Sequence, residues 1–218
     1  MGILTSFAQF YREGGLFMHF IAMCGLYIIG VAIYKFIFLL MKFNTNGANL
    51  MKQIQKLVMA NNVDKAIKLC SAAGDAALAN VLKAGLSRAN RGELEIQNAI
   101  EETVLEYTPK IKKLTDTVAV FNNLSTLLGL LGTIQGLIQA FDAVAHAAPE
   151  QKSALLASGI AVAMNTTGFG LGVAIPGMAV HMILKALENK IFNDIDLYSV
   201  KLVNLLVSRE KGTAPAEG

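Results

Sequence analysis

Charged residues are scarce in this chain of 218 residues, and that scarcity limits the class of protein it can be. They make up 16% of the sequence, whereas hydrophobic residues make up 54% and the mean hydropathy is +0.48. Because soluble domains carry about 25% charged residues, the composition excludes an ordinary soluble protein and predicts an integral membrane protein. The formal net charge is only +3, and the basic residues form no recognition run, so nothing favours a nucleic-acid binder.

Cysteines and metal-ligand motifs are also few. Cys24 lies in an apolar stretch and Cys70 in an expected cytosolic helix, so we expect no disulfide between them and interpret both as packing residues. The sequence has no CxxC, HExxH, GxSxG, Walker or GxGxxG motif, and the similar FGLGVAIPG lies inside an apolar stretch with no preceding strand. The sequence therefore predicts no metal site, no cofactor and no enzyme.

Three apolar stretches are each long enough to cross a bilayer as a helix. The first is expected to stay as an uncleaved span, and the other two are expected to form a hairpin. The expected segments are an N-terminal periplasmic or interfacial segment (1–15), transmembrane helix 1 (16–43), a cytoplasmic helical region (44–117), transmembrane helix 2 (118–145), a periplasmic turn (146–153), transmembrane helix 3 (154–184) and a cytoplasmic helix and tail (185–218).

Positive charge predicts the topology. The region 44–117 holds ten of the 19 Lys and Arg residues, whereas the N-terminal segment holds only Arg12 and the hairpin turn only Lys152. Because positively charged loops stay inside, the large loop and the C-terminus are predicted to be cytoplasmic and the N-terminus periplasmic. Lys35, near the inner end of the first span, is expected to snorkel to the interface, with contact to a partner as the alternative.

The cytoplasmic region has the pattern of short paired helices separated by a turn at Gly74 and Asp75. From Glu93 onward, a three-to-four-residue apolar spacing predicts one long amphipathic helix that runs into the second span, kinked but not ended by Pro109. A second apolar stripe at 187–205 extends the third helix into the cytoplasm. The two stripes are predicted to pack together.

Small and polar residues form a stripe on each helix of the hairpin, at the helical period. The stripes comprise Asn122, Thr126, Gly129, Thr133, Gly136 and Ala140 on the second span and Gly159, Ala163, Thr167, Gly170, Ala174 and Gly177 on the third. One interpretation is close helix packing. The other is the wall of a polar ion path. Its candidate lining residues are Thr126, Thr133, Asn165, Thr166 and Thr167.

The hairpin lacks a carboxylate at mid-membrane. In the second span the acid is Asp142, at the outer end beside His146, and the third span has only His181, beyond Pro176 toward the cytoplasm. A proton path usually needs a group that takes up and releases protons. If protons pass here, the acid is expected to come from another polypeptide.

Pro176 interrupts the hydrogen bonding of the third span. Because proline lacks an N–H, the carbonyl of Gly172 loses its helical partner, and Gly168 and Gly170 loosen the same region. A static bend and a moving hinge both fit this pattern.

Three segments carry a family resemblance: NNVDKAIKLCSAAGDAALANVLKAGL at 61–86, GLLGTIQGLIQAF at 129–141 and SGIAVAMNTTGFGLGVAIP at 158–176. Together they resemble the MotA/TolQ/ExbB proton-channel family, and three spans with a large first loop are more similar to its TolQ and ExbB branch than to four-span MotA. The resemblance implies a pentameric ring in the bacterial inner membrane around a dimeric, single-span partner of the ExbD, TolR or MotB type, whose aspartate carries the proton. It also implies that Thr133 and Thr167 line the ring near that aspartate.

Two positions depart from the family pattern. Val162 stands where many ExbB and TolQ relatives carry glutamate, and Thr126 stands where many carry proline. The extra hydroxyls suggest a differently polar path, and such a lining suits sodium as well as protons.

The sequence as a whole predicts an all-α integral membrane protein with three transmembrane helices, the second and third extended into a cytoplasmic helical bundle, in an oligomeric ring. We expect it to conduct ions, most simply protons, and with its partner to convert the ion motive force into work on the cell envelope or transport across the outer membrane. The alternative is a non-conducting membrane scaffold that assembles a multiprotein complex.

Overall fold

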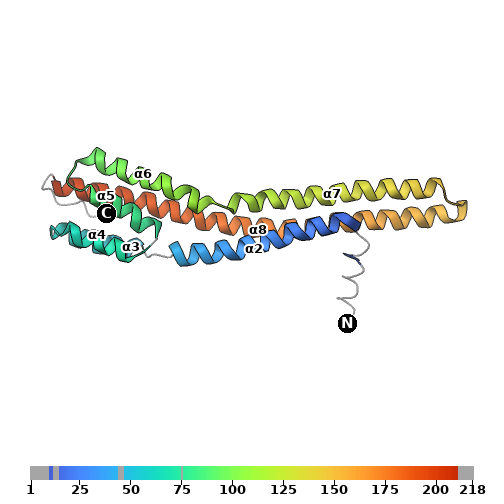
Figure 1. Ribbon diagram of the computed structural model, residues 1–218, viewed down its shortest axis with the longest axis horizontal. Helices are drawn as coiled ribbons and strands as arrows, with labels where there is room; N and C mark the ends of the chain where they lie inside the picture. The colour runs from blue at the N-terminus through green and yellow to red at the C-terminus, as the bar shows by residue number, and fades with distance from the viewer. Residues whose placement is uncertain (1–9, 12–14, 44–46, 75, 211–218) are drawn as a thin grey trace, which may run out of the picture. The chain divides into compact units, whose positions relative to one another are not determined.

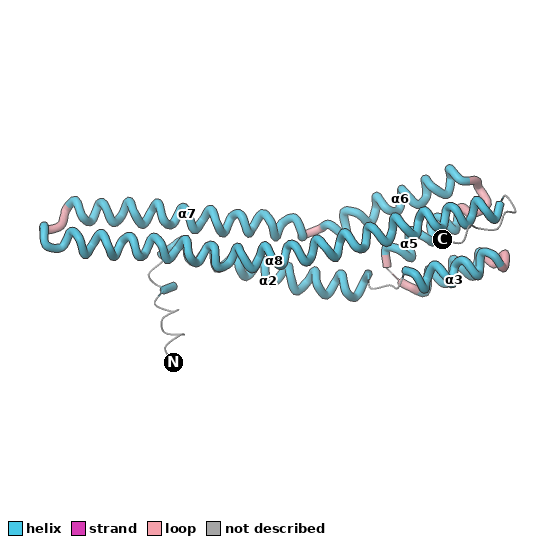
Figure 2. The backbone as a smooth tube through the Cα atoms, turned by 180° about the vertical axis from the view of Figure 1, so that it is seen from behind, coloured by secondary structure: helices cyan, strands magenta, loops and turns pink. Residues whose placement is uncertain are grey.

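The computed structural model describes residues 10–11, 15–43, 47–74 and 76–210, and this part of the chain is helical and contains no strand (Figures 1 and 2). The helices are α2 (Gly15–Phe43), α3 (Gly47–Met59), α4 (Val63–Ala72), α5 (Ala77–Ser87), α6 (Glu93–Lys112), α7 (Thr115–Ala145) and α8 (Pro149–Glu210). The predicted all-α class is confirmed. Most of the expected segment 1–15 and the last residues of the tail, 211–218, lie outside the described residues.

Three stretches, Gly15–Leu39 in α2, Glu93–Ala145 across α6 and α7, and Pro149–Arg209 in α8, each contain a helical part long and apolar enough to cross a membrane. Their number agrees with the three transmembrane helices expected from the sequence. The outward side chains of α2 are large and apolar, including Met23 and Leu26, which are 66% and 71% exposed in the single chain. Lipid or a protein neighbour can cover such a surface.

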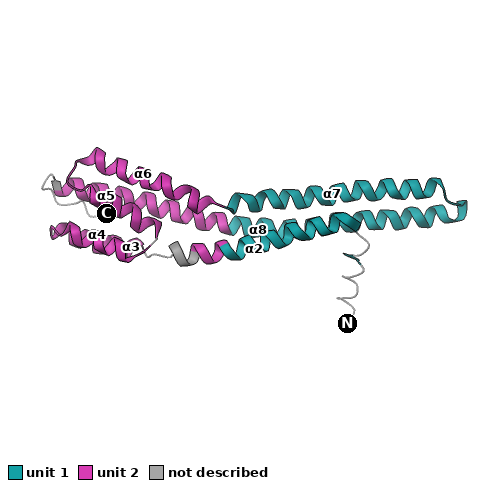
Figure 3. Cartoon of the chain, viewed as in Figure 1, with its two compact units in different colours: residues 1–34, 114–183 teal, residues 35–113, 184–218 magenta. Residues whose placement is uncertain are grey.

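The chain divides into two compact units (Figure 3). Unit 1 takes in Met1–Tyr34 and Leu114–Ile183, and unit 2 takes in Lys35–Lys113 and Leu184–Gly218. Both α2 and α8 therefore contribute residues to each unit.

In unit 1, α7 and the first part of α8 lie side by side as an antiparallel hairpin (Figures 1 and 2). Helix α2 packs on this hairpin through a small apolar core that includes Ile28, Val31 and Val118. Beside this core, the ring of Tyr27 stacks on that of Phe121 at 4.0 Å, and its hydroxyl lies 3.0 Å from the hydroxyl of Thr117.

The hairpin turn is shorter than the expected 146–153. Helix α7 ends at Ala145 and α8 already begins at Pro149, so the turn comprises 146–148. Proline in the first helical position sacrifices no helical hydrogen bond, and Glu150 in the first turn interacts favourably with the positive end of the helix dipole. These two residues start the helix before the apolar stretch begins.

In unit 2, α3 to α6 and the last part of α8 enclose one hydrophobic core. The two apolar stripes predicted from the sequence meet there through Ile96, Ile100 and Ile111 of α6 and Ile195, Leu202 and Leu205 of α8. A methyl group added at Gly85 of α5 would lie 3.0 Å from both Ile100 and Leu202, so α5 approaches both helices closely. The predicted packing of the two stripes is confirmed.

The single long helix expected from Glu93 into the second span is wrong. Helix α6 ends at Lys112, and α7 begins at Thr115 after Leu114, whose φ of 70° lies in the left-handed region. Lys112 in the last turn of α6 and Asp116 in the first turn of α7 both interact favourably with the dipoles of their helix ends. These charges suit the two helix ends, but the apolar period continues across Leu114 and gives no sign of the break.

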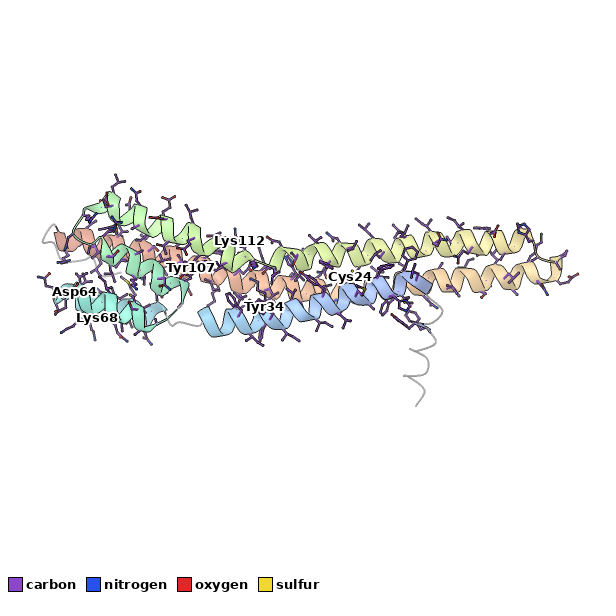
Figure 4. All side chains as sticks on the ribbon, in the orientation of Figure 1. Cys24, Tyr34, Asp64, Lys68, Tyr107 and Lys112 are labelled. Atoms are coloured by element: carbon purple, nitrogen blue, oxygen red, sulfur yellow. The ribbon has the colours of Figure 1, made fainter. Side chains whose placement is uncertain are left out.

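Both cysteines are buried and free, as expected for packing residues. Cys24 lies on α2 (Figure 4), and Cys70 lies in the core of unit 2. Burial raises the pKa of the Cys70 thiol to about 11, and the nearby Lys83 lowers it by a smaller amount, so the reactive thiolate is rare at neutral pH.

At the end of α6, the Lys112 ammonium (Figure 4) lies 5.5 Å from the ring centre of Phe192 on α8, a cation–π contact between the two helices.

Candidate ion-path site

Small residues bring α7 and α8 of unit 1 into close contact. A methyl group added at Gly170 would lie 2.8 Å from the Ser125 carbonyl oxygen, and one added at Gly129 would lie 3.3 Å from the Cα of Thr167. Further along, one added at Gly136 would lie 3.0 Å from the Cβ of Ala163. The two predicted stripes therefore face each other within one chain. For their glycines and alanines, this supports the interpretation that the stripes allow close helix packing.

Thr133 and Thr167 meet in this interface. Their hydroxyls hydrogen-bond to each other, and both lie within hydrogen-bond distance of the Gly129 carbonyl oxygen, at 3.1 Å from Thr133 and 3.0 Å from Thr167. The Thr133 hydroxyl also lies 3.4 Å from the Ala163 carbonyl oxygen. Both side chains are half-buried. Each hydroxyl has one donor and two acceptor lone pairs and can rotate, so the pair can exchange hydrogen bonds with a further polar group.

Two of the other predicted lining residues, Thr126 and Thr166, donate to carbonyls of their own helices. Thr166 is buried and donates to the Val162 carbonyl at 3.2 Å, with its methyl group against Gly132. Thr126 donates to the Asn122 carbonyl at 3.3 Å, and Asn165 is half-buried on α8. Two of the three thus direct their polar hydrogen to their own helix.

The Pro176 region lies on a different face of α8. Pro176 and Gly172 are exposed, and a methyl group added at Gly172 or Gly168 would meet no atom within 4 Å. Helix α8 continues through Pro176. The face with the interrupted hydrogen bond is therefore turned away from α7, and a hinge there remains a prediction.

Acidic residues are confined to the ends of the hairpin. Between residues 117 and 187 the acids are Asp142 and Glu150, which flank the turn. The hydroxyl pair itself contains no group that titrates near neutral pH.

The expected snorkelling of Lys35 is wrong. In unit 2 its side chain is 1% exposed, donates to the carbonyl of Ile111 and forms an ion pair with Glu188 at 3.0 Å. Sequence reasoning also missed Glu188, although this residue falls on the buried stripe of α8 between Leu184 and Ile195. The position of an acidic residue on an apolar stripe could have revealed it, because a buried carboxylate needs a cation nearby and therefore predicts a buried ion pair.

Comparisons with known proteins agree with this architecture. Residues 73–196 match a family model described as the MotA/TolQ/ExbB proton channel family. A stretch of 82 residues is 38% identical to biopolymer transport protein exbB1 of Vibrio cholerae serotype O1, and this match covers 38% of the chain and 36% of that relative's length. The structure of C. jejuni MotAB has a similar fold, with a TM-score of 0.51 and 16% identity over 93% of this chain and 79% of that chain.

Proposed function

Because the chain belongs to the MotA/TolQ/ExbB proton channel family, we propose that it is an ion-conducting subunit of an ion-driven membrane motor. With a single-span partner that bears an aspartate, it converts the ion motive force into work on the cell envelope or into transport across the outer membrane. The similarity to a biopolymer transport protein favours transport. Three apolar helices and this similarity also support the TolQ and ExbB branch of the family.

The observation that carries this proposal is the hydroxyl pair of Thr133 and Thr167. The two positions lie within the two segments that resemble the family's paired hairpin motifs, and the fold brings their hydroxyls into contact across α7 and α8. Thr133, like Thr166, lies within hydrogen-bond distance of the carbonyl four residues earlier on its own helix. Thr167 differs from both, because its hydroxyl crosses from α8 to the Gly129 carbonyl and the Thr133 hydroxyl of α7, so that two half-buried hydroxyls meet at one carbonyl.

The proton carrier is proposed to come from the partner. The hairpin offers hydroxyls and no mid-span acid, so it can align a carboxylate or water but cannot itself take up the proton. A dimeric partner of the ExbD, TolR or MotB type supplies the aspartate. Protons are the proposed ion, and sodium is the alternative because the lining is rich in hydroxyls. Val162 stands where many relatives carry glutamate, so the third span offers no carboxylate of its own to the ion path.

The protein is proposed to form a homopentameric ring in the bacterial inner membrane. The second and third spans, near 118–145 and 154–184, face the ring interior, and the first, near 16–43, faces lipid. The N-terminus and the hairpin turn lie in the periplasm, and the regions 44–117 and 185–218 lie in the cytoplasm, because the basic residues concentrate between the first two spans.

Partner-dependent ion flux tests this function. The full chain is reconstituted in liposomes with and without a single-span protein that bears a mid-membrane aspartate, sought first among the neighbouring genes, and flux is driven by a proton or a sodium gradient. We expect proton flux only with the partner, and lost when its aspartate is replaced by asparagine. Assembly of the two proteins without flux of either ion would instead support a non-conducting scaffold.

A further inference from the structure

The two residues between α6 and α7 form a turn of a kind that usually contains glycine. Lys113 has φ −50° and ψ 133°, and Leu114 has φ 70° and ψ −19°. These angles are close to those of the two central residues of a type II turn, about −60° and 120° followed by about 80° and 0°. The second position favours glycine, because the Cβ of a larger residue approaches a backbone carbonyl oxygen there. Leucine at position 114 therefore makes this turn unfavourable by itself.

The local sequence instead favours a helix through the turn. The apolar period continues across Leu114, and no glycine, asparagine or proline occurs from 110 to 121. In a continuous helix, the Ile111 carbonyl would accept a hydrogen bond from the Thr115 N–H four residues later. Because the local preference is for one helix, a contact with another part of the fold is needed to hold the turn.

Lys35 of α2 makes such a contact within unit 2. Its ammonium donates to the carbonyl of Ile111, which lies in the last turn of α6. This is the carbonyl that a continuous helix would use for its own hydrogen bond. A cation beside the last carbonyls of a helix also interacts favourably with the negative end of the helix dipole.

Glu188 of α8 holds the Lys35 ammonium in this position. Its Oε1 lies 3.0 Å from Nζ, and both side chains are 1% exposed. A buried ammonium has three N–H donors, and one carboxylate oxygen does not satisfy them all. Carbonyls inside a helix are already bonded, so the carbonyl that the end of α6 releases is a suitable second acceptor. The buried ion pair and the turn therefore favour each other.

We propose that the Lys35–Glu188 ion pair determines whether α6 and α7 are two helices or one. While the ammonium is bound to the Ile111 carbonyl, Lys113 and Leu114 stay in the turn. Without it, the carbonyl returns to the helical hydrogen-bond pattern and the two residues join α6 to α7. This conformational control is a property of the fold and does not depend on ion conduction.

Solid-state NMR of the full chain in lipid bilayers tests the contact in the wild-type protein. The chain is labelled with ¹⁵N at the lysine side chains and with ¹³C at the isoleucine carbonyls. We expect a direct dipolar contact between the Lys35 ammonium and the Ile111 carbonyl, identified by its loss in Lys35→Met. Absence of this contact in the wild-type protein overturns the proposal, whether or not any variant folds.

The ¹³Cα shift of Lys113 then reports the conformation of the turn. We expect an extended value in the wild-type protein and a helical value in Lys35→Met combined with Glu188→Met, which leaves no unpaired buried charge. Adding Leu114→Gly to this double variant should restore the extended value, because glycine adopts the turn without help from Lys35. Lys110→Met, which removes an exposed ion pair of α6, is the control and should leave the shift unchanged. An extended Lys113 in the double variant, or a helical one after Leu114→Gly is added, overturns the proposal.

Discussion

At the scale of single residues, substitutions at Thr133 and Thr167 can separate the effect of side-chain shape from the effect of the hydroxyl group. Valine keeps nearly the shape of threonine but removes the hydroxyl, and losing a hydrogen bond to a charged group costs about 1.5–3 kcal/mol. Thr133→Val and Thr167→Val are therefore expected to slow partner-dependent flux about 10- to 100-fold while the protein still assembles. Serine keeps the hydroxyl and loses a methyl group, so Thr133→Ser and Thr167→Ser should retain much more flux. Wild-type flux in both valine variants would mean that the pair only packs.

The buried ion pair of Lys35 and Glu188 gives a residue-scale prediction about stability. Removing one member of a buried pair leaves a buried charge without its counter-ion and costs about 3–5 kcal/mol, whereas replacing both by apolar residues is often neutral. Lys35→Met is thus expected to lower the melting temperature by about 10 °C, and Lys35→Met combined with Glu188→Met to recover most of this loss.

Lys110→Met is the control for that experiment. Lys110 forms an ion pair with Glu106 at 2.6 Å, but both side chains are more than half exposed, at 54% and 65%. Such surface pairs contribute little, so this variant should melt close to wild type. If Lys35→Met melts like Lys110→Met, Lys35 reaches solvent in the native protein and the pair is not buried.

At the scale of helices, the register of α7 on α8 depends on which glycines lie in the interface. A methyl group at Gly170 would lie 2.8 Å from the Ser125 carbonyl oxygen and 3.1 Å from the Cα of Gly129, both backbone atoms that cannot rotate away. Gly170→Ala is therefore expected to destabilise the chain by about 1–3 kcal/mol. Gly168→Ala, two residues earlier on an open face, should have little effect on thermal unfolding in detergent. Equal melting of the two variants would contradict this register.

The helices themselves were largely predictable, because apolar period, length and turn residues are local properties. The break at Gly74, between α4 and α5, and the two cytoplasmic stripes were predicted correctly on this basis, whereas Asp75 lies outside the described residues. The break at Leu114 was not, because a left-handed residue other than glycine leaves no compositional mark and the apolar period continues across it.

The candidate site was less predictable than the helices. The spacing of small residues indicated one face on each span, but it left open whether those faces pack within the chain or line a path. That the Thr133 and Thr167 hydroxyls meet, while Thr166 turns to its own helix, depends on rotamers and on the register of two helices. The pairing of Lys35 with Glu188 joins residues 153 positions apart, so only the tertiary fold specifies it.

At the scale of the whole molecule, the exposed apolar side chains fall into two groups, those that lipid can bury and those that need a protein neighbour. Lipid can cover those of the membrane spans, such as Leu26 on α2 and Ile138 on α7. In the proposed topology it cannot cover Leu197 and Val200 of α8 in unit 2, which are 49% and 60% exposed. Leu197 and Val200 lie three residues apart and so share one face of the helix, and we propose that further copies of the chain cover this face.

We therefore expect the ring to depend on the unit 2 part of α8 as well as on the spans. Native mass spectrometry of the purified protein should give one homo-oligomer, a pentamer in our proposal. Val200→Asp places a charge in the apolar stripe, where its desolvation on association is unfavourable, so it should shift the protein toward smaller species. Lys201→Asp, at the exposed neighbouring position, introduces the same carboxylate beside the stripe and should leave the oligomer intact. If the wild-type protein yields only monomers from lipid-like detergent, the ring is wrong. If Val200→Asp assembles as well as Lys201→Asp, the ring is held by the membrane spans alone and the stripe faces another protein.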